Sequence, residues 1–223
     1  MATRTTTFAP LFAAAAMAFP GGAHAMDDAA LSAIVDKRLA GDRTGACMAV
    51  AVIEDGGVAR AYRCADPAQA ARIGPDRAFE IGSVAKTMTS TLLADLVLQG
   101  KASLDDPLSA YLPDGTVVPD FQGQPILLRH VVTHTSGLPA LPSRMPMPNP
   151  ADPYAALTTD DLLASLADVQ LAQAPGTRFE YSNFASMLLS YAVARRAGTD
   201  FESLLRERLF IPLGMAGAYI TTP

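Results

Sequence analysis

Ser83 and Lys86 lie three residues apart in the stretch FEIGSVAKTMTS, which covers residues 79–90. Residues at this spacing share a face of a helix, so the lysine can lie beside the serine hydroxyl. A serine is a poor nucleophile until a neighbour takes its proton, and a lysine serves as base only where its surroundings favour the neutral form. Taken alone, the spacing fits an ordinary helix start better, with Ser83 as N-cap and Lys86 solvated.

A second pair of polar residues, Tyr181 and Asn183, lies in PGTRFEYSN, just before an apolar helical pattern. A phenol next to a lysine can relay a proton, and an amide can hold a substrate carbonyl or the lysine. By itself this pair is also explained by a tyrosine in a short strand and an asparagine helix cap.

Four segments in a fixed order are more specific than either pair. FEIGSVAKTMTS, LLRHVVTHTSGLP, PGTRFEYSN and LFIPLGM together resemble the serine β-lactamase and penicillin-binding protein superfamily, and most of all its class C branch. The resemblance covers the chain from Leu31 to the end. That branch includes class C β-lactamases, D-alanyl-D-alanine carboxypeptidases and endopeptidases, and β-lactamase-like esterases.

The resemblance implies roles for the four polar residues. Ser83 would be acylated, and Lys86 would help to deprotonate it. Tyr181 would act as general base and then as acid toward the leaving group, and Asn183 would contact the substrate and the lysine. The implied fold is α/β (α+β), a mostly antiparallel sheet flanked by helices with a helical lobe, and the site lies in the cleft between them.

One element of the family pattern is absent from this sequence. No Lys-Thr-Gly or His-x-Gly motif follows Tyr181, although the family carries one on a strand that also supplies the second oxyanion donor. The later strands are missing too, so the chain resembles a C-terminally truncated member. Loss of one oxyanion donor costs about 2.7–4 kcal/mol of transition-state stabilisation. We therefore expect residues 26–223 alone to be poorly stable and to turn nitrocefin over inefficiently.

The substrate stays open within this resemblance. A penicillin-binding, carboxypeptidase-like hydrolase acting on peptidoglycan peptides is the first expectation, with a class C-like β-lactamase or a carboxylesterase as alternatives. A truncated relative that only binds wall peptide or a partner is a further alternative. Neither a cofactor nor a metal is expected, because residues 26–223 contain only two histidines, His130 and His134, and no Cys-x-x-Cys. The nearby pair His134 and Ser136 is interpreted as structural, since no nucleophile elbow is present.

The surrounding pattern predicts mainly helices. Apolar residues at helical spacing indicate helices within 27–41, 83–99, 183–197 and 201–210. Shorter helices are predicted near 107–112, within 125–139 before its Thr-Ser-Gly turn, and near 158–169. The segment 138–153 holds six prolines and is predicted to be a long surface loop.

Cys47 and Cys64 flank a predicted hairpin. Two β-rich runs surround Asp55-Gly56, which is a strong two-residue turn signal. In that register the two cysteines face each other, so a cross-strand disulfide is possible in an oxidising compartment. The alternatives are two buried free thiols or a bulged turn that shifts the register by one residue.

The N-terminus has the layout of a secretory signal. Arg4 precedes an apolar run, and Ala23 to Ala25 form a small-x-small cleavage pattern. We expect a signal peptide at 1–25, a hydrolase domain at 26–223, and a periplasmic or secreted protein without a membrane span. The net charge of −5, without clusters of basic residues, argues against nucleic acid as a partner. The oligomeric state is open.

Overall fold

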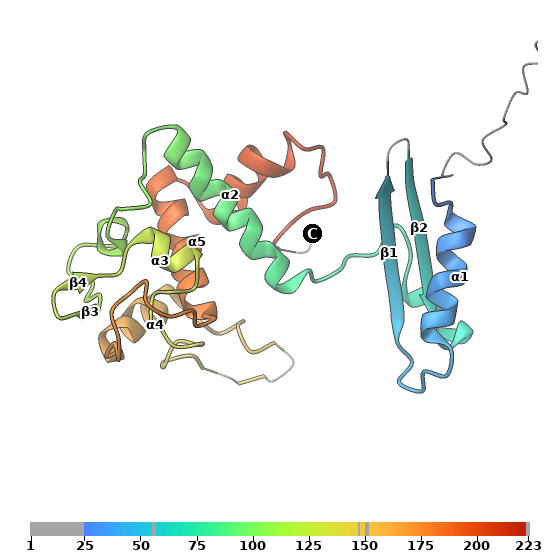
Figure 1. Cartoon of the computed structure of the whole chain (residues 1–223), viewed down its shortest axis with the longest axis horizontal. Helices are drawn as coiled ribbons and strands as arrows, with labels where there is room; N and C mark the ends of the chain where they lie inside the picture. Colours follow the sequence, from blue (N-terminus) through green and yellow to red (C-terminus); the bar gives the residue numbers. More distant parts are fainter. Residues whose placement is uncertain (1–24, 55–56, 147, 150–151, 222–223) are drawn as a thin grey trace, which may run out of the picture. The chain divides into compact units, whose positions relative to one another are not determined.

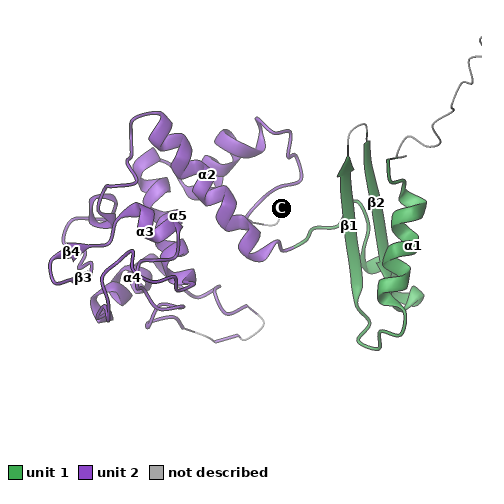
Figure 2. Ribbon diagram, in the orientation of Figure 1, with its two compact units in different colours: residues 1–79 green, residues 80–223 purple. Residues whose placement is uncertain are grey.

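The computed structural model describes residues 25–54, 57–146, 148–149 and 152–221. The chain divides into two compact units, Met1–Phe79 and Glu80–Pro223 (Figure 2). Except for Ala25, the predicted signal peptide lies outside the described residues. No helix in the described part of the chain is long and apolar enough to cross a membrane.

The first unit is a hairpin with a helix packed on one face (Figure 1). Its elements are α1 (Asp28–Leu39), β1 (Cys47–Glu54), β2 (Gly57–Cys64) and the 3-10 helix η1 (Pro67–Arg72). Leu31 and Val35 of α1 bury their side chains against Ala59 and Ala61 of β2. Burial of this apolar surface is what holds the pair of strands, since a two-stranded sheet alone is marginal.

The two strands are antiparallel in the register expected from a two-residue turn, although the turn itself, residues 55 and 56, lies outside the described residues. Cys47 pairs with Cys64, and the structure joins them in a disulfide. The bond closes the end of the hairpin that is far from the turn, where the strands would otherwise fray.

The second unit is mainly helical. Its helical elements are η2 (Gly82–Val84), α2 (Ala85–Leu98), η3 (Leu108–Tyr111), α3 (Leu128–Val132), α4 (Thr159–Ala164), η4 (Ser165–Asp168), α5 (Asn183–Ala197), α6 (Phe201–Leu205) and the π-helical turn η5 (Arg206–Phe210). A small antiparallel hairpin of β3 (Asp120–Phe121) and β4 (Gln124–Pro125) adds an element that the sequence pattern did not predict.

The core of the second unit forms where α5 packs against α2, α3, α4 and α6 (Figure 1). Leu92 and Leu93 of α2 and Phe184 and Leu188 of α5 are all buried there. Both helices carry their apolar residues at spacings of three and four, which places them on one face. This packing matters for function because the residues singled out for chemistry lie at the N-terminal ends of the same two helices.

The ends of α5 follow from its flanking residues. The hydroxyl of Ser182 accepts the N–H of Ala185 at 2.9 Å and caps the first turn. Gly198 takes the left-handed conformation, with φ of 77°, and ends the helix. The predicted helix over 183–197 is thereby confirmed.

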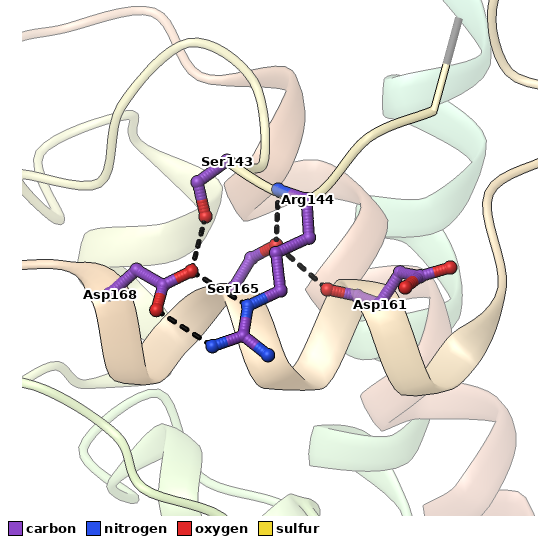
Figure 3. A network of polar contacts seen from close by, with 5 residues as sticks. All are labelled: Ser143, Arg144, Asp161, Ser165 and Asp168. Atoms are coloured by element: carbon purple, nitrogen blue, oxygen red, sulfur yellow. Dashed lines mark hydrogen bonds and ion pairs between the residues drawn. The ribbon is translucent and has the colours of Figure 1, made fainter. Parts of the chain in front are cut away.

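The described residues of the segment 138–153 form no helix or strand, as predicted. Side chains on the α4–η4 segment anchor it (Figure 3). The guanidinium of Arg144 donates two hydrogen bonds of 2.8 Å to Asp168, and Ser143 donates one of 2.7 Å to the same carboxylate. Hydrogen bonds from Arg144 and Ser143 hold the pKa of Asp168 well below its usual range. The hydroxyl of the buried Ser165 accepts the backbone N–H of Arg144 at 3.1 Å.

Candidate active site

Ser83 lies in the 3-10 turn that leads into α2. Gly82 precedes it with φ of 53°, a left-handed conformation that glycine adopts without steric cost. The N-cap positions of η2 and α2 are Ile81 and Val84, and neither makes a side-chain capping bond. Ser83 is therefore not the helix cap of the simpler interpretation, and its exposed side chain is available to other groups.

Lys86 links Ser83, its partner in the first pair, to Asn183 of the second pair. Its Nζ donates to Ser83 Oγ at 2.9 Å and to Asn183 Oδ1 at 2.8 Å. The lysine is half-buried rather than fully solvated. Asn183 is free for this contact because Ser182, one residue earlier, caps α5 instead. An asparagine cap, the simpler explanation of Asn183, is therefore wrong.

Tyr181 completes the cluster from the other side. Its hydroxyl lies 2.5 Å from Ser83 Oγ, and Lys86 Nζ lies 4.9 Å from the centroid of its ring. Hydrogen bonding with Lys86 and then with Ser83 lowers the pKa of Tyr181 below its ordinary value of 10.0. A phenol with a lowered pKa is a better proton acceptor near neutral pH, because more of it is ionised.

The segment that follows α3 holds Tyr181 and Asn183 in place. Five hydrogen bonds link residues 134–140 to residues 176–183, and four of them are accepted by backbone carbonyls. The N–H groups of Gly176, Glu180 and Asn183 bond the carbonyls of Thr135, His134 and Ala140 at 2.8, 2.7 and 2.9 Å, and the hydroxyl of Ser182 bonds the carbonyl of Pro139 at 2.6 Å. The HTSGLP stretch is thus the support on which the Tyr-x-Asn segment rests.

A cavity of about 370 Å³ opens beside Ser83 and Lys86. One part of its wall is apolar and comes from Tyr154, Met187 and Phe201. Thr89, Ser186 and Ser190 line another part, and their hydroxyls bond backbone carbonyls of α2 and of the α5 segment. The size is within the range of small-molecule sites.

The structure brings Ser83, Lys86, Tyr181 and Asn183 together, and it leaves other polar residues outside the cluster. Ser136 has an exposure of 0%, and its hydroxyl accepts the N–H of Leu138 at 3.3 Å, so it supports the turn rather than pairing with His134 as a nucleophile. No group of three or more potential metal ligands occurs among the described residues.

The sequence did not indicate the position of His134. Its imidazole packs against the ring of Tyr181 with centroids 4.5 Å apart. The wall residues Tyr154, Met187 and Phe201 were missed as well. Each lies in its own loop or helix, and no local spacing connects them to Ser83.

Known proteins are similar to this chain in sequence. A family model described as Beta-lactamase matches residues 31–223. The D-alanyl-D-alanine-carboxypeptidase/endopeptidase AmpH of Escherichia coli (strain K12) is 36% identical over 174 residues, which are 77% of this chain and 45% of the relative. A β-lactamase of the same organism is 33% identical over 177 residues, 79% of this chain and 44% of the relative. The chain thus spans less than half the length of these curated relatives.

Solved structures agree with the sequence comparison. The β-lactamase/D-alanine carboxypeptidase from Yersinia pestis, complexed with citrate, superposes with a TM-score of 0.71 at 31% identity, covering 86% of this chain and 56% of that one. A class C β-lactamase superposes with a TM-score of 0.68 at 27% identity and covers 89% of this chain and 53% of that one. The predicted α/β (α+β) fold class, with antiparallel strands and a helical lobe, is confirmed. The chain belongs to the β-lactamase family of serine hydrolases, which includes β-lactamases and penicillin-binding proteins.

Proposed function

We propose that this chain performs serine hydrolase chemistry through an acyl-enzyme on Ser83. One observation carries the proposal: Ser83 Oγ lies within hydrogen-bond distance of both Lys86 Nζ, at 2.9 Å, and the Tyr181 hydroxyl, at 2.5 Å. An adjacent base activates a serine by taking its proton, and a nearby cation stabilises the negative charge that develops.

In the first step the ionised Tyr181 takes the proton of Ser83 as the hydroxyl oxygen attacks the substrate carbonyl. The positive charge of Lys86 stabilises both the phenolate and the developing negative charge on Ser83. Asn183 holds Lys86 in the required position through the 2.8 Å bond. Tyr181 then returns the proton to the leaving group, and an ester between Ser83 and the acyl group remains until water hydrolyses it.

As substrate we propose a peptidoglycan peptide of the D-alanyl-D-alanine type. The support is the family and the names of the relatives, among them a D-alanyl-D-alanine-carboxypeptidase/endopeptidase. Lactam hydrolysis is the second candidate, because relatives of 33% and 32% identity are β-lactamases and the acylation step is shared. A carboxylesterase uses the same step and is the third.

We further propose that the protein acts outside the cytoplasm, in the periplasm or as a secreted protein. The support is the charged, apolar and small-residue order of residues 1–25. A wall-peptide substrate would be met in the same compartment.

The test is covalent labelling with a fluorescent penicillin, read after denaturing electrophoresis. The purified chain should become labelled, and Ser83→Ala should abolish the label. Ser90→Ala is the matched control. That serine lies about two turns further along the chain from Ser83, and its hydroxyl bonds the backbone carbonyl of Lys86, so its loss should leave labelling intact. A folded, unaltered chain that takes no label would support the alternative of a non-catalytic binding relative.

A further inference from the structure

His134 contacts the segment around Tyr181 through both its side chain and its backbone. Its imidazole lies against the Tyr181 ring, with centroids 4.5 Å apart and planes tilted by 34°. It also meets the ring of Phe179 edge-on at 5.9 Å. The phenol of Tyr181 is therefore flanked by an aromatic ring from another segment of the chain, which limits its sideways movement.

The same residue holds the backbone on both sides of Tyr181. The carbonyl of His134 accepts the N–H of Glu180 at 2.7 Å, and its Nδ1 accepts the N–H of Ser182 at 3.3 Å. His134 achieves this in a left-handed backbone conformation, with φ of 55°. That conformation is uncommon for residues other than glycine, and histidine is among the residue types that adopt it more often.

The acceptor role requires a neutral imidazole, because a protonated ring has no free lone pair on Nδ1. Burial, and secondarily the charge of Lys86, lower the pKa of His134. In the part of the chain that the structure describes, the titratable groups that contact or act on this imidazole are Tyr181 and Lys86. The environment therefore favours the state in which the bond to Ser182 can exist.

We propose that His134 is a positioning residue that holds the Tyr181 hydroxyl at hydrogen-bond distance from Ser83. The inference rests on the proposed function in so far as Tyr181 is the proton acceptor. His134 does not line the cavity beside Ser83, and its contacts are with Tyr181, Phe179 and the backbone of Glu180 and Ser182.

His130 provides an internal comparison. Its Nδ1 also accepts a backbone N–H, that of Leu127 at 3.2 Å, and burial lowers its pKa as well. It contacts none of Ser83, Lys86, Tyr181 and Asn183 in the contacts of the described residues. A substitution at His130 should therefore reproduce the loss of a structural histidine without disturbing Tyr181.

The experiment measures the pKa of Tyr181 by NMR of tyrosine labelled at Cζ, with Tyr181→Phe identifying the resonance. His134→Asn can keep a hydrogen-bond acceptor and the left-handed backbone but loses the ring, whereas His134→Phe keeps a ring and loses the acceptor. In both variants the phenol should move away from Lys86 and Ser83, so its pKa should rise toward 10. His130→Asn should leave it unchanged. An unchanged Tyr181 pKa in folded His134 variants would overturn the inference.

A second measurement needs no variant at His134. In the unaltered chain, the imidazole resonances of His134 should carry a ring-current shift from Tyr181, and Tyr181→Leu should remove it. Resonances that stay in place in that variant would show that the two rings are not in contact, which also overturns the inference.

Acylation by a fluorescent penicillin separates this inference from the proposed function. Both His134 variants should be labelled more slowly by roughly 10- to 100-fold, as expected for a small displacement of a catalytic group, and His130→Asn should be labelled at the normal rate. A chain whose Tyr181 pKa responds to His134 but which takes no label would retain the positioning role and reject the acylation chemistry.

Discussion

At the scale of single residues, two side chains donate hydrogen bonds to one oxygen atom, and a third side chain holds one of the two in place. Ser83 Oγ receives hydrogen bonds from Lys86 and Tyr181, and Lys86 is in turn bonded to Asn183. The charge of the lysine therefore acts on both the nucleophile and the phenol. Removing any one of the three should affect the others, so we expect their effects on acylation not to be additive.

Tyr181→Phe tests the proton acceptor. The change removes one oxygen atom and keeps the ring that packs on His134, so the fold should be unaffected. We expect acylation by penicillin to slow by about 10²- to 10⁴-fold, the usual contribution of a general base. Tyr191→Phe, a phenol on α5 outside the site, is the control and should label normally. Normal labelling of Tyr181→Phe would show that another group takes the proton.

The pH dependence of acylation should reflect the same phenol. Since Lys86 and Ser83 lower the pKa of Tyr181 below 10.0, the ionised base should accumulate below that pH. We expect the rate of labelling to rise with pH as Tyr181 becomes ionised, and Tyr181→Phe should lose this rise. Stopped-flow or quenched labelling at a series of pH values measures it. A rate that is flat over this range would contradict the assignment.

At the scale of elements, local patterns predicted more of the fold than of the site. The run that starts after Ser182 and stops at Gly198 gave the limits of α5, because caps and periodicity are local properties. The 3-10 and π-helical turns at the ends of α4 and α6 were not separable from the helices beside them. The bond between Lys86 and Asn183 spans 97 residues of sequence. No periodicity indicates such a contact, so only the family resemblance placed these residues in one site.

The hairpin of the first unit yields a prediction about its cysteines. Alkylation of the denatured chain without reductant should leave its mass unchanged, because Cys47 and Cys64 are joined. The same treatment after reduction should add two labels and serves as the control. Two labels without reductant would mean that the thiols are free.

The ion pair between Arg144 and Asp168, which anchors the proline-rich segment, gives a prediction about proteolysis. Asp168→Asn weakens the two bonds that hold the Arg144 guanidinium, so trypsin should cut after Arg144 sooner than in the unaltered chain. Asp160→Asn removes a carboxylate from the same helical segment without touching Arg144 and should leave the rate of cleavage unchanged. Mass spectrometry of the fragments measures the rate of cleavage after Arg144. Equal rates in the two variants would mean that the ion pair does not restrain the segment.

At the scale of the whole molecule, the two units have separate cores, and all four proposed site residues lie in Glu80–Pro223. The chain spans less than half the length of the curated relatives that it matches. The second unit also holds His130 and His134, and each of these side chains is half-buried.

The free energy of unfolding should fall as the pH drops below about 6.5. The pKa values of His130 and His134 are lowered from 6.5, mainly by burial, so the unfolded chain binds more protons than the folded one just below that pH. Carboxyls with lowered pKa values, such as Asp168 and Glu202, have ordinary values of 3.8 and 4.5 and act at lower pH. Thermal unfolding between pH 8 and about 6 should therefore show mainly the histidine effect.

Replacement of both histidines by asparagine should flatten that pH dependence, whatever it does to the absolute stability. The comparison is between slopes, so a uniformly destabilised variant still gives an answer. A slope that is as steep without the two histidines as with them would assign the effect to other groups.

The most direct measurement of the central claim is peptide mapping after exposure to penicillin. The chain is denatured, digested and analysed by mass spectrometry for a peptide that has gained the mass of the drug. The account predicts one adduct, on Ser83. An adduct on another residue, or none on a chain that is demonstrably folded, would contradict it.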